Sequence, residues 1–252
     1  MEILFGFLIA TIIGMTGTGG GTLAAPMLVL AWGLPPAEAI GTSMVFATVV
    51  KLVAAPAYVV RRQFNAAALT RLLAGGLPGV LAGTLLLNGF HKWHLDNVVA
   101  ATVGGTTAIL AIASLWRLRR GQTPAPQRGH SRWLPWVALP IGVEVGFSSA
   151  GAGALGCMAL MLLTPLTATS IIGTDLLFGL GLSAAGSGLH LALGSVNGQV
   201  AVHLLAGGVA GAVVGPWLAA RVPAHVMRGV LSVALSVLGT QLFWRGVAPL
   251  VH

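Results

Sequence analysis

Three charged side chains fall inside long apolar segments of the sequence, where a charge is costly. They are Lys51, Glu144 and Asp175. A charge near the centre of a membrane costs about 2.5–3.5 kcal/mol on insertion scales, so a charge retained there is a candidate for function by default. A lysine can hold an anion, and a carboxyl group can take up and release a proton. The alternative is that each charge belongs to an internal ion pair that holds helices together.

Two glycine-rich runs could bind an anion through their backbone. They extend from Gly14 to Thr22 and from Gly146 to Ala154. Glycine-rich turns expose N–H groups, and the helices that follow them present the positive ends of their dipoles. The alternative is that these glycines only let helices pack closely, as small-xxx-small motifs do. The expected anion-binding positions are Gly17, Gly19, Gly20, Gly21, Gly151 and Gly153.

Hydroxyl groups in and near these runs could replace the water shell of an oxyanion. Thr22 lies in the first run, Thr42 and Ser43 lie on the next apolar segment, and Thr174 occupies a similar place in the second half of the chain. Such hydroxyls can equally bond to the backbone of their own helix, four residues back. Together with Lys51, these groups favour a site for an anion.

Proton transfer has three candidate residues. Glu144 comes just before the second glycine-rich run, and Asp175 follows Thr174 directly. His190 could relay protons, or it could anchor a helix end at the membrane interface. The chain has one cysteine, Cys157, and no cluster of Cys and His that would suggest a metal site. We therefore expect neither a metal nor a cofactor.

The elements that position these residues are expected to be membrane helices. The 252 residues include only 13 basic and 5 acidic ones, so charged residues make up 7% of the chain, against about 25% in soluble domains. Apolar residues reach 56%, and about 20 consecutive apolar residues suffice for a helix to cross a bilayer. The composition excludes a soluble fold and predicts an all-α polytopic membrane protein. Spanning helices are predicted at 36–60, 66–88, 96–116, 168–193, 198–220 and 226–246.

The chain contains an internal repeat at an offset of 132 residues. This offset superimposes the two glycine-rich runs without a gap. It also superimposes an identical run, Leu-Leu-Ala-Gly-Gly, at 72–76 and 204–208, and the triplet Ile-Gly-Thr at 40–42 and 172–174. Shared membrane composition does not explain identical runs in one register. The two halves are therefore predicted to be copies of one fold.

The repeat divides the chain into two halves around a polar linker. We predict that 1–116 and 133–252 are the two transmembrane repeats and that they form a single integral membrane domain. Residues 117–132 between them contain five arginines and two prolines, as a cytoplasmic loop would. An arginine-rich loop could also contact anionic lipid headgroups. The net charge of +8 is then a sign of orientation, and no nucleic-acid partner is needed to explain it.

The first element of each half cannot be one ordinary spanning helix. Residues 1–33 would form a helix about 50 Å long, whereas the hydrocarbon core is about 30 Å thick, and the glycines would break it. We expect two short helices around each glycine-rich run. If each pair is a re-entrant hairpin, every half has three crossings and the halves are inverted; if each pair crosses once, the halves are parallel.

We favour hairpins and inverted repeats. A half-helix of about 12 residues spans about 18 Å, enough to reach the middle of the membrane and return. The hairpin topology places ten basic residues in the cytoplasm and the alternative places nine, so the positive-inside rule does not separate them.

The run from Gly14 to Pro26, Gly-x-x-Gly-x-Gly-Gly-Gly-x-x-x-x-Pro, resembles the signature of the TauE/SafE family of membrane permeases. Residues 39–43, Ala-Ile-Gly-Thr-Ser, follow it, and 173–175 resembles a second copy. The second copy departs from the pattern, with Asp175 in the place of Ser43. The resemblance covers essentially the whole chain and implies transport, usually export, of small anions such as sulfite or organosulfonates. It points to Gly17, Gly19, Gly20, Gly21, Pro26, Gly41, Thr42 and Ser43 as site residues.

We expect a secondary transporter that exports such anions by alternating access with proton coupling. Its expected location is the bacterial inner membrane, which it crosses several times. One alternative is an anion channel on the same scaffold. Another is an intramembrane serine hydrolase, although Ser148 and Ser149 do not stand in the Gly-x-Ser-x-Gly frame of a nucleophile elbow. The expected partners are a small anionic substrate and membrane lipids but no nucleic acid, and the sequence leaves a homodimer open.

Overall fold

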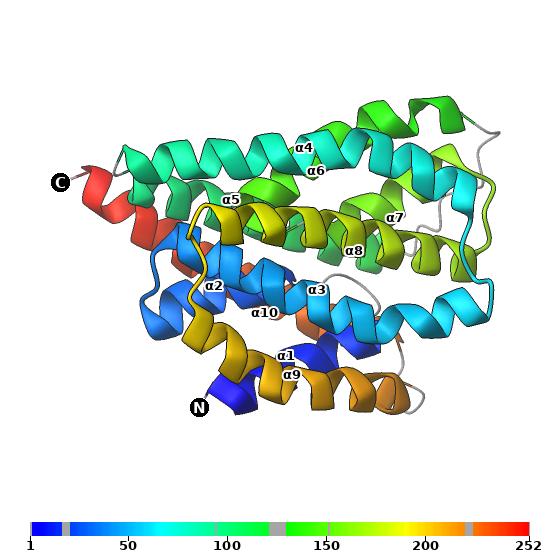
Figure 1. Cartoon of the computed structure of the whole chain (residues 1–252), viewed down its shortest axis with the longest axis horizontal. Coiled ribbons are helices and arrows are strands. Elements are labelled where there is room, and N and C mark those ends of the chain that lie inside the picture. The colour runs from blue at the N-terminus through cyan, green and yellow to red at the C-terminus, as the bar shows by residue number, and fades with distance from the viewer. Residues whose placement is uncertain are drawn as a thin grey trace.

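The fold is a bundle of α-helices (Figure 1). The computed structural model describes residues 2–16, 21–93, 95–120, 130–150, 152–219 and 224–251. Over these residues the first half contains α1 (Glu2–Thr16), α2 (Gly21–Trp32), α3 (Pro36–Val60), α4 (Ala66–Lys92) and α5 (Asp96–Arg120). A short 3₁₀ turn at Ser131–Trp133 leads into α6 (Leu134–Ser148), α7 (Ala152–Leu163), α8 (Ala168–Ala192), α9 (Gly198–Ala219) and α10 (Ala224–Val251).

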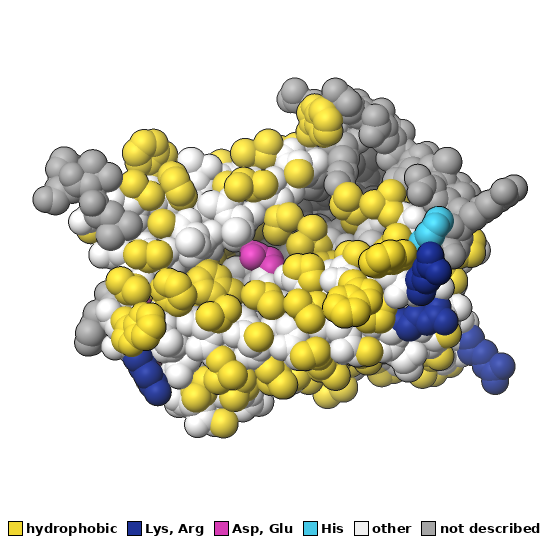
Figure 2. All heavy atoms as spheres, turned by 90° about the horizontal axis from the view of Figure 1, so that it is seen from above, with side chains coloured by type: hydrophobic (Ala, Val, Ile, Leu, Met, Phe, Trp, Pro, Cys, Tyr) yellow, Lys and Arg dark blue, Asp and Glu magenta, His cyan; other side chains and the backbone are white. Residues whose placement is uncertain are grey.

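Among the described residues, five segments are long and apolar enough to cross a membrane. Hydrophobic side chains cover much of the face in Figure 2, and lysine and arginine side chains lie toward its ends. The sixth predicted span falls within α10, a helix of 28 residues. The prediction of an all-α, multi-pass membrane protein is therefore confirmed. The five segments are Pro36–Val60, Ala66–Lys92, Asp96–Ala113, Ala168–Ala192 and Gly198–Gly215.

Local sequence explains where the spanning helices begin. Pro36 stands in the first turn of α3, where its missing N–H group is not needed. Asn65 caps α4, because its side-chain oxygen accepts a hydrogen bond from the Ala68 N–H at 2.8 Å. Thr167 caps α8 in the same way through Ser170. The predicted starts at 36, 66 and 168 agree with the structure.

The helices α1 and α2 form a hairpin, called hairpin 1, whose outer ends lie together. The Phe5 ring near the start of α1 packs edge-on against the Trp32 ring at the end of α2, with centroids 5.0 Å apart. Helices of this length measure about 18–22 Å, which is less than the roughly 30 Å thickness of a hydrocarbon core. The helix α2 runs back toward the start of α1 (Figure 1). The helices α6 and α7 also pack against each other and form hairpin 2.

The predicted breaks over 14–22 and 146–154 were too wide. The helix α6 continues to Ser148, and Ser149 ends it in a left-handed conformation with φ of 59°. The helix α1 continues to Thr16. Gly146 stays helical although glycine weakens a helix by about 1 kcal/mol, because a side chain there would overlap the Val80 carbonyl on α4. Close packing thus accounts for glycines that the sequence suggested were breaks.

Helices that the offset of 132 residues relates pack against each other in antiparallel pairs. Gly41 on α3 faces His190 on α8, and Gly173 on α8 faces Tyr58 on α3. These two contacts are copies of each other under the offset. The helices α5 and α10 form the other large pair of this kind. Antiparallel packing of equivalent helices is the geometry that an inverted repeat would have.

Each hairpin lies against a spanning helix of the other half. The helix α1 runs beside α9, and α6 runs beside α4 (Figure 1). Backbone meets backbone at these contacts, because a methyl group added at the glycines would overlap carbonyl oxygens of the hairpin helix. These glycines are Gly75, Gly79 and Gly83 on α4, and Gly207 and Gly211 on α9.

The hydrophobic core consists of two clusters, one around each hairpin. Phe46 on α3 lies in the cluster around hairpin 1, and Phe178 on α8 lies in the cluster around hairpin 2. The two phenylalanines are repeat equivalents, and both are fully buried. Each ring packs against a glycine of the other half, Gly208 and Gly76 respectively. Each half therefore supplies most of one cluster, and residues of the other half complete it.

Candidate functional site

Lys51 lies at the centre of the interface between the two halves. The contacts of Gly41 with His190 and of Tyr58 with Gly173 are repeat equivalents, so the point midway between them, at about residue 50 of α3, lies near the pseudo-two-fold axis. Lys51 is next to this point, and only 6% of its surface is exposed. In transporters built from inverted repeats, substrate sites lie near the membrane midplane at the repeat interface.

Hydroxyl groups accompany Lys51 at the contact between α3 and α8. Thr48 lies one turn from Lys51 on the same face of α3, and its Oγ1 atom is 3.4 Å from Oγ of Ser187 on α8. Ser183, the repeat equivalent of Lys51, is also buried. Sequence reasoning missed these three residues. Two of them had a signal in the sequence, namely the i, i+3 spacing of Thr48 from Lys51 and the offset of 132 for Ser183, whereas Ser187 had none.

Asp175 provides the opposite charge at the same interface. It lies on α8, with 2% of its surface exposed, and its carboxyl group interacts electrostatically with Lys51 across the interface. These two residues form no direct ion pair within 4.0 Å. The internal ion pair that was the alternative role of these charges is therefore not formed between Lys51 and Asp175, which are two separated, buried charges.

Glu144 lies elsewhere, in a groove of apolar side chains. Its Oε1 atom accepts a hydrogen bond from Oγ of Ser148 at 2.8 Å. The groove has a volume of about 530 Å³ and lies between α5, α6 and α7. Figure 2 shows acidic atoms amid hydrophobic side chains in the middle of one face. Glu144 and Asp175, both predicted as proton-binding groups, thus have different surroundings: one is partly buried in an apolar groove and the other lies in the core.

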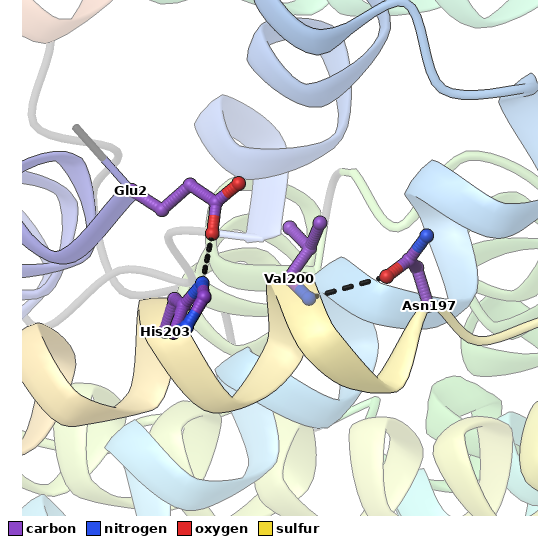
Figure 3. Close-up of polar contacts among 4 residues, drawn as sticks. All are labelled: Glu2, Asn197, Val200 and His203. Carbon is purple, nitrogen blue, oxygen red and sulfur yellow. Dashed lines mark hydrogen bonds and ion pairs between the residues drawn. The ribbon is translucent and has the colours of Figure 1, made fainter.

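Thr42 and Thr174 occupy helix junctions. Oγ1 of Thr42 accepts a hydrogen bond from the Asn197 N–H at 3.0 Å, and Oγ1 of Thr174 accepts one from the Asn65 N–H at 2.9 Å. The Asn197 side chain in turn accepts from the N–H of Val200 at 3.2 Å, as Figure 3 shows. The two threonines therefore hold the starts of α9 and α4 in equivalent ways. Ser43 is buried and donates to the Ile40 carbonyl at 2.8 Å, the backbone bond that was its alternative role.

The start of hairpin 1 is tied to α9 by an ion pair. Nδ1 of His203 pairs with Oε2 of Glu2, and Figure 3 shows the two side chains pointing toward each other from their separate helices. At the repeat-equivalent position of His203, Arg71 on α4 donates to Oγ of Ser131 at 2.5 Å. Both hairpins are therefore fastened near their first residues.

His190 is buried at the end of α8, with 1% of its surface exposed. Its Nδ1 atom lies 2.8 Å from Oγ of Ser195. The ring interacts with the backbone carbonyl of Gly146, although Nε2 has no partner at hydrogen-bonding geometry. Burial does not fit a side chain that anchors a helix in the membrane interface.

Part of the expected anion site lies outside the described residues, namely Gly17, Gly19, Gly20 and Gly151. Gly21 begins α2, Thr22 follows it, and Gly153 is buried in the first turn of α7. The starts of α2 and α7 therefore direct the positive ends of their helix dipoles toward the two glycine-rich runs.

Comparison with known proteins gives one family. Residues 2–242 match the family described as "Sulfite exporter TauE/SafE". The chain is similar to "Probable membrane transporter protein YjnA" of Bacillus subtilis (strain 168), with 26% identity over 250 residues that cover 95% of this chain and 98% of that protein. It is similar to a "Probable membrane transporter protein" of Xylella fastidiosa (strain Temecula1 / ATCC 700964), with 28% identity over 98% of this chain and 95% of that protein.

No solved structure matches the chain. The family match covers both halves, both hairpins and every residue of the Lys51 interface. The resemblance seen in the sequence is thus confirmed, and the chain is a membrane transporter that belongs to the sulfite exporter TauE/SafE family.

Proposed function

We propose that the protein is a secondary transporter that carries a small oxyanion, such as sulfite or a sulfonate, with Lys51 as the residue that binds the anion. The observation that carries this proposal is the burial of Lys51 beside the pseudo-two-fold axis. A buried ammonium group without an ion-pair partner is costly. An oxyanion bound at the interface would supply a negative charge next to Lys51. The hydroxyls of Thr48 and Ser187 donate to the backbone carbonyls of Met44 and Ala184 in this structure, so each would have to turn its hydrogen toward the anion in order to bind it.

Alternating access is the mechanism that the architecture supports. The equivalent pairs α3–α8 and α5–α10 cross the interface in antiparallel fashion, so the two halves can rock about a central site. Transport of this kind makes and breaks no covalent bond in the substrate, and we assign the protein no enzymatic activity. The proton-binding group is Asp175 or Glu144, export across the bacterial inner membrane is the expected direction, and 117–132 is the expected cytoplasmic linker.

The test is transport by the purified protein in proteoliposomes with radiolabelled sulfite. Replacing Lys51 by Ala should lower the initial rate at subsaturating sulfite by about 30-fold or more, because removing one partner of a buried charged contact costs about 2 kcal/mol or more. The matched control is Lys92→Ala, since Lys92 is exposed and is the second of the two lysines in the chain.

Two further measurements separate binding from folding. Lys51→Ala should lower the thermal midpoint, because it leaves a cavity and removes the positive charge that acts on the buried Asp175 carboxyl group, so the transport rates are compared at equal amounts of folded protein. Lys51→Arg keeps the charge and should retain part of the activity. If Lys51→Ala transports sulfite at the wild-type rate, Lys51 is not the anion site and the proposal fails.

A further inference from the structure

The carboxyl group of Asp175 lies in a space that α7 leaves free at Gly156. A methyl group added at Gly156 would overlap Oδ1 of Asp175, and it would also press on the Phe178 ring at 3.3 Å. Both Gly156 and Asp175 are buried, so neither can turn toward solvent. An aspartate at this position of α8 therefore requires a residue without a side chain at the facing position of α7.

The first half of the chain has the opposite combination at the equivalent positions. Ala24 on α2 stands where α7 has Gly156, and Ser43 on α3 stands where α8 has Asp175. Ala24 and Ser43 are also buried. In each half, the larger residue on one helix is matched by the smaller residue on the other, as packing at constant volume requires. The fold around Asp175 is adapted to hold a carboxyl group.

Cys157, the next residue of α7, satisfies part of the hydrogen-bonding capacity of this carboxyl group. Both the thiol and the backbone N–H of Cys157 donate hydrogen bonds to Asp175. The Oδ1 atom, in contrast, is buried without a hydrogen-bond partner. A buried carboxylate oxygen without a partner is costly, and a proton bound to the group removes the charge that makes it so. Cys157 of hairpin 2 thus contacts the carboxyl group of Asp175, whereas Oδ1 has no hydrogen-bond partner among the described residues.

Few other ionisable groups act on Asp175. The helices packed against α8 are α3, α4, α6 and α7. Lys51 on α3 and Cys157 on α7 interact with the carboxyl group, and the described parts of α4 and α6 contribute no such group. An anion bound at Lys51 would offset the positive charge that stabilises the Asp175 carboxylate. Binding of the anion and binding of a proton to Asp175 would therefore favour each other.

We propose that Asp175 is the group that binds the proton moved together with the anion, and that Gly156 and Cys157 are the residues of hairpin 2 that position it. This inference rests on the proposed function. The proton adds to the carboxylate from one side of the membrane and leaves to the other, and no other bond forms or breaks. Because hydrogen bonds to a carboxylate are stronger than those to a neutral carboxyl group, protonation weakens the contact between Cys157 and Asp175 and so weakens the polar part of the contact between hairpin 2 and α8.

The positioning role of Gly156 is tested by a cycle of stability measurements on the purified full-length protein. Gly156→Ala should lower the thermal midpoint by several degrees, since the methyl group meets the carboxyl group. Adding Asp175→Ser should restore the midpoint, because the double variant reproduces the Ala24 and Ser43 pair of the first half. If Gly156→Ala is as stable as the wild type, or if the double variant is no more stable than Gly156→Ala, the proposed packing is wrong.

The proton-binding role is tested by infrared titration of the same proteins without substrate. A protonated-carboxyl band should be present in the wild type and absent in Asp175→Ser. Cys157→Ala should move the midpoint of this band to a higher pH by about one unit, because it removes about 1.4 kcal/mol of hydrogen bonding to the carboxylate. Cys157→Ser should restore part of this shift. An unchanged band in Asp175→Ser, or an unchanged midpoint in Cys157→Ala, would overturn the assignment.

A transport assay tests whether proton binding is coupled to movement of the substrate. A pH gradient should accelerate sulfite uptake into wild-type proteoliposomes but not into proteoliposomes with the stable double variant. Acceleration that persists in the double variant would refute Asp175 as the coupling group. If the wild type moves no sulfite at all, the proposed substrate is wrong, whereas the stability cycle and the infrared band still decide whether Gly156 and Cys157 position a proton-binding Asp175.

Discussion

The two halves of the chain differ at the two residues that carry charge at their interface. Lys51 in the first half corresponds to Ser183 in the second, and Asp175 in the second half corresponds to Ser43 in the first. In both cases one copy holds a buried hydroxyl and the other holds a buried charge. The charges therefore occupy positions that are polar in both copies, and each half supplies one of them.

The sequence identified these charges because a charge in an apolar segment stands out by composition alone. It could not assign Thr42 and Thr174 in the same way, since a hydroxyl is compatible with both a binding site and a helix junction. Which role applies depends on the partner, and the backbone N–H groups of Asn197 and Asn65 that bond to these threonines are far away in the chain. Contacts of this range follow from the three-dimensional packing.

Ser149 offers a prediction about backbone strain. It is a non-glycine residue with φ of 59°, a left-handed conformation that costs about 1 kcal/mol or more for an L-residue with a side chain. Ser149→Gly should raise the free energy of unfolding by about 0.5–1 kcal/mol, in line with the glycine at the equivalent position in the first half. The measurement is thermal or denaturant unfolding in detergent.

The control for this substitution is Ala159→Gly in the middle of α7, which should lower the stability by about 1 kcal/mol. If Ser149→Gly also lowers it, the left-handed conformation of Ser149 is not a source of strain.

Glycine has two opposite uses along these helices, and sequence alone does not separate them. In the hairpins it was expected to break the helix, yet Gly146 lies inside α6 and brings it against α4. On α4 the glycines at 75, 79 and 83 fall at a spacing of four residues, so they lie on one face of a continuous helix. The starts of α3 and α8 were predictable, because Pro36 and Thr167 are local signals. The ends of the hairpin helices depend on contacts with the other half.

The glycines at 75, 79 and 83 on one face of α4 predict which substitutions the bundle tolerates. Gly79→Val should abolish or severely reduce the yield of folded protein, because a side chain would overlap the Leu139 carbonyl and force α6 away. Gly89→Ala is the matched control on the same helix, since a methyl group there meets no atom within 4 Å. It should be neutral, or stabilising by up to about 1 kcal/mol.

The comparison is made by size-exclusion profile and thermal midpoint in one detergent. Equal behaviour of the two variants would show that the close contact between α4 and α6 is not needed for folding.

The two chain ends lie on the same side of the molecule. Figure 1 shows the N-terminal and C-terminal ends at the same end of the bundle, as hairpins followed by three crossings in each half require. For the hairpin topology the sequence predicts ten basic residues on the linker side and two, Lys92 and Arg245, on the side of the chain ends. For this topology the positive-inside rule predicts a cytoplasmic linker.

Reporter fusions test this orientation. Alkaline phosphatase fused after the last residue should be active, because it would be outside the cytoplasm, and green fluorescent protein inserted in 121–129 should fluoresce. A fluorescent C-terminal fusion would contradict the topology. The all-α, multi-pass character was predictable from the sequence. The choice between hairpins and broken spanning helices was not, because it depends on the contact of Phe5 with Trp32.

The position of Lys51 beside the pseudo-two-fold axis has a consequence for why both copies are in one chain. In a symmetric dimer of single-copy proteins, every residue near the axis meets its own twin. Two lysines would then lie side by side in a medium of low dielectric constant, where like charges repel strongly. In this chain the twin of Lys51 is Ser183, a neutral hydroxyl. Duplication within one polypeptide thus allows a single positive charge to stand next to the pseudo-two-fold axis, and the single oxyanion that we propose as substrate would neutralise it.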